Sequence, residues 1–401
     1  MTTEIVIVGG ARTPMAEYVG TPGYGKFKDV SAIDLAAHAS KAALARSKVA
    51  PDSIDHVVMG NALQTSVDAI YGARHVGLKS GCPQHAGGLT VNRLCGSGIQ
   101  SIVNAAQMIQ LGECTTVLAG GMENMSQAPF SVYGTRSGIS FGQQPVMQDS
   151  LFAALTDPLA GLMMAQTAEK IAKRLGITRE AQDEYALRSH QLGAKAVKEG
   201  RFAAEIEPYT IKGRKGDEVV ALDDHIKPET TLEGLAKLRA AFGKDGTVTA
   251  GNASGIVDGA AAVVLTTDAR AKADKLDVWC KVRSWAYVGV DPTEMGIGPV
   301  PAIRKCLERA GLATHQVDRI EINEAFSAQY LGCEKELELD RTKCNVNGGA
   351  ISLGHPLGAT GTRLVLTLMH ELRRSKKRYG VASACIGGGQ GIAILLENTQ
   401  L

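Results

Sequence analysis

The sequence predicts an α/β protein in which strands and helices alternate in layers and the core is duplicated. Apolar runs of strand length, such as residues 5–8 and 55–61, alternate with segments in which apolar residues recur at helical spacing. The last third of the chain repeats the element order of the first third, which indicates two related halves. The length of 401 residues exceeds a typical single core and predicts about two or three domains.

Composition excludes several classes of protein. Hydrophobic residues make up 44% and charged residues 21%, as in ordinary soluble globular proteins. The 43 basic and 41 acidic residues give a net charge of +2, which does not favour nucleic acid as a partner. No apolar run approaches the roughly 18 residues of a membrane span. The eight cysteines lack paired spacing, and no basic segment precedes residues 5–8, so we expect a reduced, cytoplasmic protein.

The N-terminal core half is expected at residues 1–122, completed by residues 247–271. Ser31 is a suitable N-cap because its side chain can accept a backbone N–H at a helix start. The expected elements are, in order, a strand at 5–8, a helix at 31–47, strands at 55–61 and 89–91, a helix at 99–109 and a strand at 116–119.

Residues 123–246 differ in character and are expected to form an inserted loop domain over the core. Residues 143–149 look irregular, and two polar-faced helices are expected at 165–175 and 179–198, with Thr178 as the N-cap of the second. Such an insertion is a natural place to bind the body of a substrate.

The C-terminal core half is expected at residues 272–401, because it mirrors the first half. Residues 345–347 correspond to residues 90–92, and a glycine-rich turn and an amphipathic helix follow each. The repeat therefore places the turns around Cys95 and His355 at equivalent positions. Sites in such α/β units gather where strands end, and these turns lie at strand ends.

Cys95 is the first candidate for chemistry. It lies on a predicted tight strand-to-helix turn, where Gly96 and Gly98 allow backbone geometry that bulkier residues resist. The positive end of the helix dipole and free N–H groups there favour the thiolate, the form that attacks carbonyls. The alternative is a small buried cysteine beside a structural turn, and only partners elsewhere in the chain favour the nucleophile.

Other polar side chains follow predicted strand ends. His355, flanked by glycine-rich sequence, is a candidate base for Cys95. Cys385 precedes glycines 387–389, whose N–H groups could form an anion-binding nest. Asn323 closes a strand, and Glu324 beside it is expected to be structural. The alternatives are a structural histidine, a buried thiol and a turn-forming asparagine. No metal site is expected, because these cysteines and this histidine lack the paired spacing of zinc ligands.

The motifs that carry these residues resemble those of the thiolase family, in that family's order. They are N-R-L-C-G-S-G at 92–98, G-N-A-S-G at 251–255, N-E-A-F at 323–326, G-H-P-L-G at 354–358 and C-I-G-G-G at 385–389. Together they span essentially the whole chain and look most like the mitochondrial-type 3-ketoacyl-CoA thiolases and the acetyl-CoA acetyltransferases. The resemblance implies a five-layered αβαβα core of two duplicated halves.

The resemblance also implies a role for each candidate residue. Cys95 would attack the 3-keto carbonyl of a 3-ketoacyl-CoA after His355 removes its proton, which gives an acyl-enzyme. Cys385 would protonate the departing acetyl-CoA carbanion and then deprotonate the incoming CoA, in a ping-pong scheme. One oxyanion site would comprise His355 and a water held by Asn323, and the other the N–H groups of Cys95 and Gly387.

Coenzyme A is the implied co-substrate, with no permanently bound cofactor and fatty-acid β-oxidation as the process. The matching CoA-binding positions are Met164, Lys227, Phe242, Ala250, Gly251, Ser254, Ala325 and Phe326. Lys227 stands where an arginine is expected, which alters contact geometry more than charge. Residues 163–164 are Met-Met where acetoacetyl-type thiolases carry His-Met, which favours the degradative type. A homodimer or homotetramer is expected, without a choice between them.

Several alternatives stay open at this point. An acetyl-CoA acetyltransferase working in the Claisen direction would differ in its rates on short and long substrates. A condensing ketosynthase usually needs a second histidine or lacks the counterpart of Cys385. A non-catalytic acyl-CoA-binding protein would show no turnover sensitive to iodoacetamide, and a cysteine hydrolase would leave Cys385 without a role.

Overall fold

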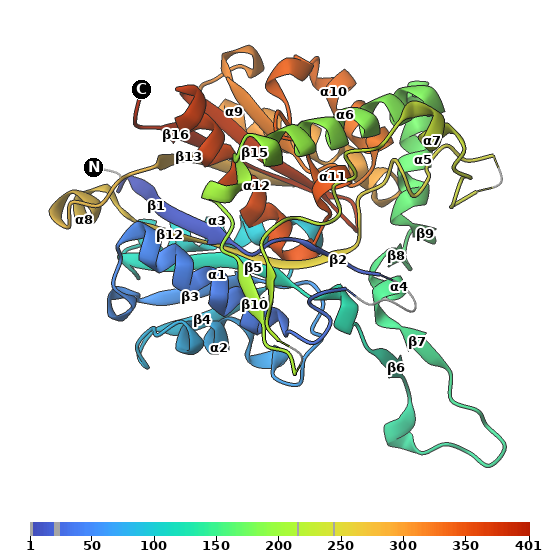
Figure 1. The fold of residues 1–401 in the computed structure, drawn as a ribbon, viewed down its shortest axis with the longest axis horizontal. Coiled ribbons are helices and arrows are strands. Elements are labelled where there is room, and N and C mark those ends of the chain that lie inside the picture. Colours follow the sequence, from blue (N-terminus) through green and yellow to red (C-terminus); the bar gives the residue numbers. More distant parts are fainter. Residues whose placement is uncertain (1–2, 20–24, 215, 244) are drawn as a thin grey trace.

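A mixed sheet runs through the whole molecule, which we describe from a computed structural model (Figure 1). The structure describes residues 3–19, 25–214, 216–243 and 245–401, so residues 1–2 of the predicted first half lie outside it. The strands of this sheet are β1 (Ile5–Arg12), β2 (Ala16–Glu17), β3 (His56–Gly60), β4 (Gly87–Val91), β5 (Thr116–Glu123), β12 (Val257–Thr267), β13 (Cys280–Gly289), β14 (Arg319–Ile322), β15 (Tyr379–Ile386) and β16 (Gln390–Asn398).

Strand order and direction show the duplication. The order is β14-β15-β16-β13-β1-β12-β5-β3-β4, with β2 beside β12. In the first half β12 is antiparallel to β1 and β5, and β3 is parallel to β5. In the second half β16 is antiparallel to β13 and β15, and β14 is parallel to β15. The halves meet where β1 pairs with β13 at Val6 and Ile7. The predicted repeat is therefore present in the topology.

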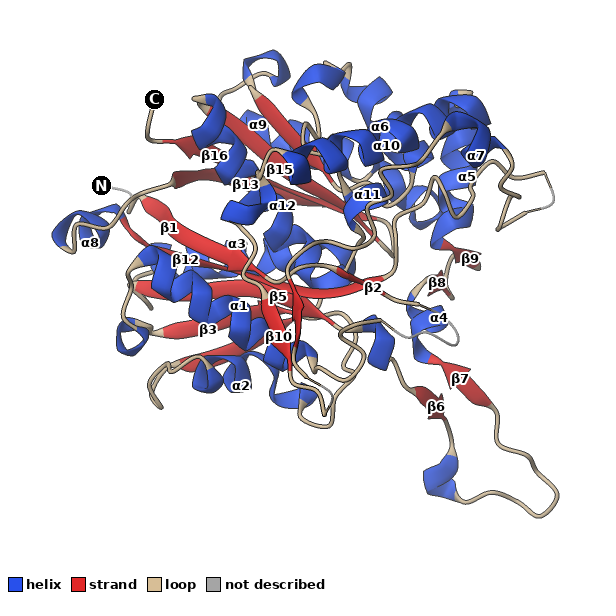
Figure 2. Cartoon of the chain, in the orientation of Figure 1, coloured by secondary structure: helices blue, strands red, loops and turns tan. Residues whose placement is uncertain are grey.

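Helices form three layers around the two halves of the sheet, as Figure 2 shows. The helices of the core are α1 (Ala32–Ser47), α2 (Gly72–Lys79), α3 (Ser97–Gln110), α8 (Asp268–Ala273), α9 (Pro299–Ala310), α10 (Ser327–Leu337), α11 (Ala350–Leu353) and α12 (Leu357–Ser375). Apolar residues of α3 and α12, such as Ile102 and Leu368, pack between the two halves. Residues of α1 and α2 cover the outer face of the first half, and α9 and α10 cover that of the second. The five-layered αβαβα core is confirmed.

Residues 124–246 hold short strands and helices outside this sheet, whereas Glu123, the first residue of the predicted insertion, still belongs to β5. They are β6 (Phe130–Val132), β7 (Met147–Asp149), α4 (Ser150–Ala154), β8 (Thr156–Asp157), β9 (Leu162–Met163), α5 (Met164–Leu175), α6 (Arg179–Lys198), β10 (Tyr209–Ile211), β11 (Glu218–Val220) and α7 (Leu232–Ala236). The pair β6–β7 extends away from the body as an arm (Figure 1). The end of the stretch expected to be irregular is therefore a strand, β7.

Two predicted helix starts are confirmed by their caps. The Ser31 hydroxyl accepts the N–H of Asp34 at 3.0 Å, and α1 begins at the next residue. The Thr178 hydroxyl accepts the N–H of Ala181 at 3.2 Å, and α6 begins at the next residue. Each cap satisfies an N–H that has no partner within the helix.

Two predicted strand boundaries are wrong. The first strand does not end at Gly9 but runs to Arg12, because a register shift after Ile7 lets β1 stay paired with β12. At residues 345–347, the counterpart of the end of β4, no strand forms, and isolated bridges join Ile320 to Cys344 and Val346 to Gly348. Asn345 has a φ of 45°, which no strand residue adopts, and its side-chain amide bonds both the N–H and the carbonyl of Ile322.

Candidate active site

The N-termini of α3 and α12 meet in the central layer, and this contact brings the turns of Cys95 and His355 together. Cys95 lies in a 3-10 turn, Leu94–Gly96, directly before α3, and His355 lies two residues before α12. A Cβ on Gly98 would lie 2.4 Å from the backbone nitrogen of Thr362, so the two helices touch backbone to backbone.

The predicted reason for the glycines beside Cys95 is wrong. Gly96 has a φ of −88° and Gly98 lies within α3, so neither needs the left-handed region. The residue with a left-handed φ, 46°, is Leu94. The glycines are needed for close approach instead, since a Cβ on Gly96 would lie 2.5 Å from Ile386.

We expect Gly98→Ala to lower the free energy of unfolding by about 3 kcal/mol, because the added methyl meets backbone that cannot move aside. The matched control is Gly112→Ala just beyond the same helix, where φ is 77° and nothing lies within 4 Å. That change is expected to cost about 1 kcal/mol, from the backbone conformation alone. Urea unfolding measures both, and an equal cost for the two would contradict the close packing.

The thiol of Cys95 is enclosed by protein, although the residue is partly exposed. It packs beside Leu357, the first residue of α12. Burial raises its pKa to about 11, the backbone N–H of Gly387 acts in the opposite direction, and the charge of Glu123 adds to the rise. The backbone N–H groups act toward the thiolate, as expected, but burial outweighs them. The thiol needs a base.

Alkylation of Cys95 by iodoacetamide tests this state directly. Only the thiolate reacts, and a raised pKa keeps the thiolate fraction small at neutral pH. We expect the rate to keep rising with pH and to level off only near the raised pKa of about 11. Peptide mass spectrometry resolves Cys95 from the other cysteines, and a plateau at or below neutral pH would contradict the assignment.

His355 is held as a neutral base. The Thr360 hydroxyl donates to the Pro356 carbonyl at 2.9 Å, so it accepts from Nδ1–H of His355 at 2.6 Å. The Asn323 amide nitrogen lies 3.2 Å from Nε2. Both contacts require the tautomer with its lone pair on Nε2. Burial, with a smaller contribution from the charge of Arg363, lowers the pKa of His355 to about 3.

The loop of His355 depends on its preceding glycine, as the sequence indicates. Gly354 has a φ of 87°, and a Cβ there would lie 2.2 Å from Val257. The N–H of His355 donates to the carbonyl of Gly255 at 2.9 Å. These contacts tie the histidine to the first core half.

Asn323 is fully buried, and its N–H donates to the carbonyl of Ser383 at 2.9 Å. Among the described residues its side-chain oxygen has no hydrogen-bond partner, which leaves an acceptor free inside the site. Glu324 is structural: it accepts from Tyr185, Ser189 and Asn345 side chains and from one backbone N–H, rather than from backbone amides alone.

Cys385 is the last but one residue of β15 and is buried beside Met164 and Ala325. Burial raises its pKa well above the usual value, and the charge of Cys95 adds to the rise, so the two sulfurs lie close enough to interact. Gly388 and Gly389 have φ of 78° and 79°, and this turn directs the N–H of Gly387 at Cys95. The structure thus groups Cys95 with Cys385 and Gly387, and His355 with Asn323.

The predicted CoA-binding residues lie mostly in one connected region. Met164, Ala325 and Phe326 pack around Cys385, and Phe326 also packs with Phe242 against α5. Ala250, Gly251 and Ser254 belong to the loop that follows α7. There the Ser254 N–H donates to the Ala325 carbonyl at 3.0 Å, Gly251 lies against Leu235 and Leu238, and Ala250 is its neighbour.

Lys227 differs from the other predicted CoA contacts. Its Nζ binds the carboxylate of Glu17 at 3.0 Å, and its backbone N–H donates to His190 at 3.2 Å. The ammonium group already has a partner, which the sequence does not indicate.

Two residues that contact the site were not predicted to act there. Thr360, which fixes the tautomer of His355, follows the G-H-P-L-G motif, and a hydroxyl five residues after the histidine was the only signal. Glu123 receives four N–H groups around Cys95, and the sequence carries no signal for it.

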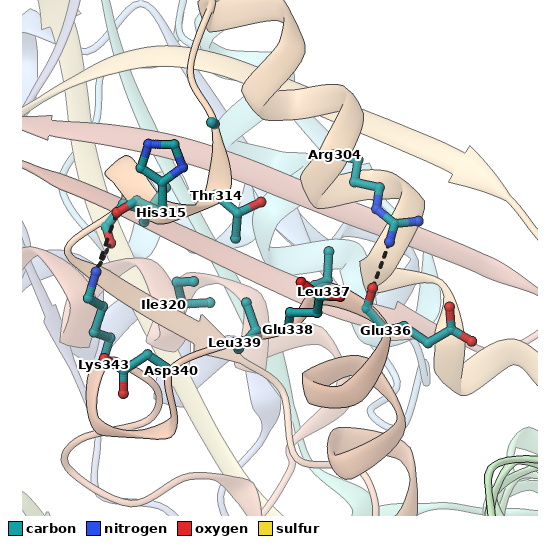
Figure 3. A pocket seen from close by; sticks show the side chains of 12 residues that line it. Arg304, Thr314, His315, Ile320, Glu336, Leu337, Glu338, Leu339, Asp340 and Lys343 are labelled. Atoms are coloured by element: carbon teal, nitrogen blue, oxygen red, sulfur yellow. Dashed lines mark hydrogen bonds between the residues drawn. The ribbon is translucent and has the colours of Figure 1, made fainter.

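The cavity in Figure 3 is not part of this site. It measures about 560 Å³ and lies on the outer layer of the second half, between α9 and α10. Arg304 and Lys343, which line it, are bound to the carbonyls of Glu336 and His315. Over the described ranges, no three His, Cys, Asp or Glu side chains are grouped to hold a metal ion. No helix in the described part of the chain is long and apolar enough to cross a membrane.

A partly exposed cysteine and a neutral histidine on adjoining turns, a second, buried cysteine and a backbone N–H directed at the first are the groups that an acyltransferase of the cysteine-nucleophile class requires. Comparison with known families identifies the family: residues 5–269 match the thiolase N-terminal domain and residues 276–398 the thiolase C-terminal domain. The chain belongs to the thiolase family, as its motifs predict.

Relatives with two different names match along the full length. The human mitochondrial 3-ketoacyl-CoA thiolase is 49% identical over 395 residues, covering 98% of both chains. The acetyl-CoA acetyltransferase of Escherichia coli is 47% identical over 393 residues, also covering 98% of both. The crystal structure of the human thiolase in complex with CoA superimposes with a TM-score of 0.95, covering 99% of this chain and 98% of that one.

Proposed function

We propose that this chain is a 3-ketoacyl-CoA thiolase, which uses CoA to cleave a 3-ketoacyl-CoA into acetyl-CoA and a shortened acyl-CoA in fatty-acid β-oxidation. The observation that carries the proposal is the pairing of Cys95 with the N–H of Gly387 and the thiol of Cys385. A donor that faces the nucleophile suits an oxyanion, and a second thiol suits a proton donor to carbon. Full-length identity to a thiolase of this name supports it.

The first half-reaction uses both groups of residues. Nε2 of His355 takes the proton of the Cys95 thiol, and the thiolate attacks the 3-keto carbonyl. The oxyanion sits on the N–H groups of Cys95 and Gly387, since these face the sulfur. The C–C bond then breaks, and the electron pair stays on the acetyl-CoA carbanion. Its thioester oxygen is held by His355 and a water on Asn323, and Cys385 gives its proton to the carbon.

The second half-reaction reverses the proton transfers. The Cys385 thiolate takes the proton of CoA, and the CoA sulfur attacks the acyl group on Cys95. The same oxyanion site holds the intermediate until the Cys95–carbon bond breaks. Cys95 then recovers its proton from His355. All protons balance over the cycle without a metal or a resident cofactor.

CoA contacts are proposed at Met164, Lys227, Phe242, Ala250, Gly251, Ser254, Ala325 and Phe326. Their packing around Cys385 supports this placement, because the CoA sulfur must reach that thiol. To bind a phosphate of CoA, Lys227 would have to share or give up its ion pair with Glu17. The loss of that ion pair offsets part of the free energy gained from the phosphate.

The second candidate is an acetyl-CoA acetyltransferase that condenses two acetyl-CoA molecules in the Claisen direction. The 47% identity to the Escherichia coli enzyme favours it. Met163, where acetoacetyl-type thiolases carry histidine, favours the degradative reaction.

The test of function is a substrate series with the purified protein. Acetyl-CoA formation from acetoacetyl-CoA and from longer 3-ketoacyl-CoAs is measured in the presence of CoA. Faster turnover of the longer substrates is the expected result. A strict preference for acetoacetyl-CoA would favour the acetyltransferase, and absence of turnover with intact CoA binding would favour a non-catalytic acyl-CoA-binding protein.

A homo-oligomer, dimer or tetramer, is also proposed. The edge strand β4 leaves its outer side unpaired, with Leu89 exposed. The β6–β7 arm exposes large apolar side chains that a second copy would cover. They are Phe130, Tyr133, Ile139, Phe141, Val146 and Met147. Light scattering of the purified protein tests this. The cytoplasmic location and the division into two core halves and an insertion at 123–246 that covers the CoA site stay predictions.

A further inference from the structure

Glu123, the last residue of β5, is a fully buried carboxylate whose two oxygens each accept two N–H groups. One oxygen accepts from the Asn61 side chain at 2.9 Å and the Leu63 backbone at 3.0 Å. The other accepts from the backbone of Ala62 at 3.1 Å and of Gly358 at 2.8 Å. The carboxylate therefore joins the loop after β3 to the first turn of α12.

The first turn of α12 lies close to both Cys95 and His355 in the chain fold. Gly358 lies three residues after His355, and its carbonyl lies 3.0 Å from the Cβ position of Gly98, on the helix that follows Cys95. The charge of Glu123 also reaches Cys95, whose pKa it raises. Glu123 thus accepts a hydrogen bond from the first turn of α12, beside His355, and also acts electrostatically on Cys95.

The geometry requires Glu123 to be ionised, because all four partners are donors and a protonated carboxyl would confront one of them with its own proton. Burial raises its pKa to about 7, and the backbone N–H groups of Leu63, Gly358 and Ala62 act in the opposite direction. Two other ionisable groups interact with it. The charge of Asp258 on β12 adds to the rise in the Glu123 pKa, and the charge of Glu123 in turn raises the pKa of Cys95. Within the described part of the chain the hydrogen-bond partners of Glu123 are these four neutral N–H donors, which hold the charge.

We propose that Glu123 is a positioning residue of the acyl-transfer reaction. Its carboxylate holds the loop at residues 61–63 against the N-terminus of α12, which presents His355 to Cys95. Its negative charge acts on Cys95 and disfavours the thiolate in the resting protein, which protects the nucleophile from other electrophiles. The activity part rests on the proposed function, whereas the effect on Cys95 does not.

The test combines two variants with a matched control. Glu123→Gln removes the charge and one acceptor oxygen, and Glu123→Asp keeps the charge on a shorter arm. The control is Glu169→Gln, another carboxylate that accepts backbone N–H groups, from Thr247 and Val248, without acting on Cys95. Each is measured for thiolytic turnover and for the rate of Cys95 alkylation by iodoacetamide.

We expect Glu123→Gln to alkylate about threefold faster at about pH 8, because the Cys95 pKa falls, while turnover drops about tenfold or more. A purely structural role would not speed one reaction and slow the other. Glu123→Asp is expected to keep the wild-type alkylation rate and to lose turnover, and Glu169→Gln to keep the alkylation rate. Unchanged alkylation in Glu123→Gln, or full turnover, would overturn the proposal.

If Glu123→Gln does not fold, Asn61→Ala serves instead, since it keeps the carboxylate and removes one donor. The logarithm of the Cys95 alkylation rate against pH is expected to show an inflection where Glu123 titrates, and this inflection should move to higher pH in Asn61→Ala. An inflection that stays in place overturns the proposal. If the wild type shows the inflection without thiolysis, the proposed function and the activity part of this inference fail, while the effect of Glu123 on Cys95 stands.

Discussion

Cys95→Ser is expected to lower kcat for thiolysis by about 10,000-fold or more, the largest effect of any single change in this protein. A serine hydroxyl is a far weaker acid than a thiol, and the base that must ionise it is a neutral imidazole whose own pKa burial has lowered to about 3. The main contact that stabilises the sulfur's charge is the N–H of Gly387, which is a neutral donor.

The measurement is acetyl-CoA formation from a 3-ketoacyl-CoA and CoA. Cys114→Ser is the matched control, since Cys114 is a free thiol beyond the far end of α3. It should retain wild-type turnover. Full activity in Cys95→Ser would refute the nucleophile assignment.

His355→Ala is expected to lower kcat by about 1,000-fold, because one side chain supplies both the base for Cys95 and a donor to the thioester oxyanion. The loss should appear in kcat more than in KM, since both roles act in the transition state. Thr360→Val should give a smaller loss, because Nδ1–H loses its acceptor and the ring is no longer held in one tautomer.

The control for His355 is His315→Gln. His315 lies in a 3-10 turn on the outer layer of the second half, away from both catalytic turns. Wild-type turnover is expected there. A His355→Ala variant that loses only CoA affinity would show that the histidine binds substrate without acting as the base.

The sequence predicts elements whose causes are local. Ser31 and Thr178 cap helices with their own side chains, and helical spacing alone indicates α6 over its full length. The repeat also predicts the equivalence of the two catalytic turns, because it fixes which strand and helix flank each. The correspondence of residues 345–347 with residues 90–92 does not extend to a strand, for a local reason that spacing does not show, the left-handed φ of Asn345.

Features that depend on distant contacts could not be predicted. The sequence suggests that the glycines beside Cys95 are needed for their backbone dihedral angles. Gly98 is needed instead because Thr362, 264 residues away, packs against it. The ionisation of Cys95 depends on burial, so the sequence indicates the N–H groups that favour the thiolate but not the burial that outweighs them. Glu123 ends an apolar strand and meets its four donors only in the folded chain.

The central claim is that Cys95 becomes acylated during turnover. It is tested by mixing the protein with acetyl-CoA, quenching with acid and mapping the peptides by mass spectrometry. The account predicts one acetyl group on the peptide of Cys95, released when CoA is added before the quench. An acetyl group on Cys385 or elsewhere, or none at all in a protein that still turns over, would contradict it.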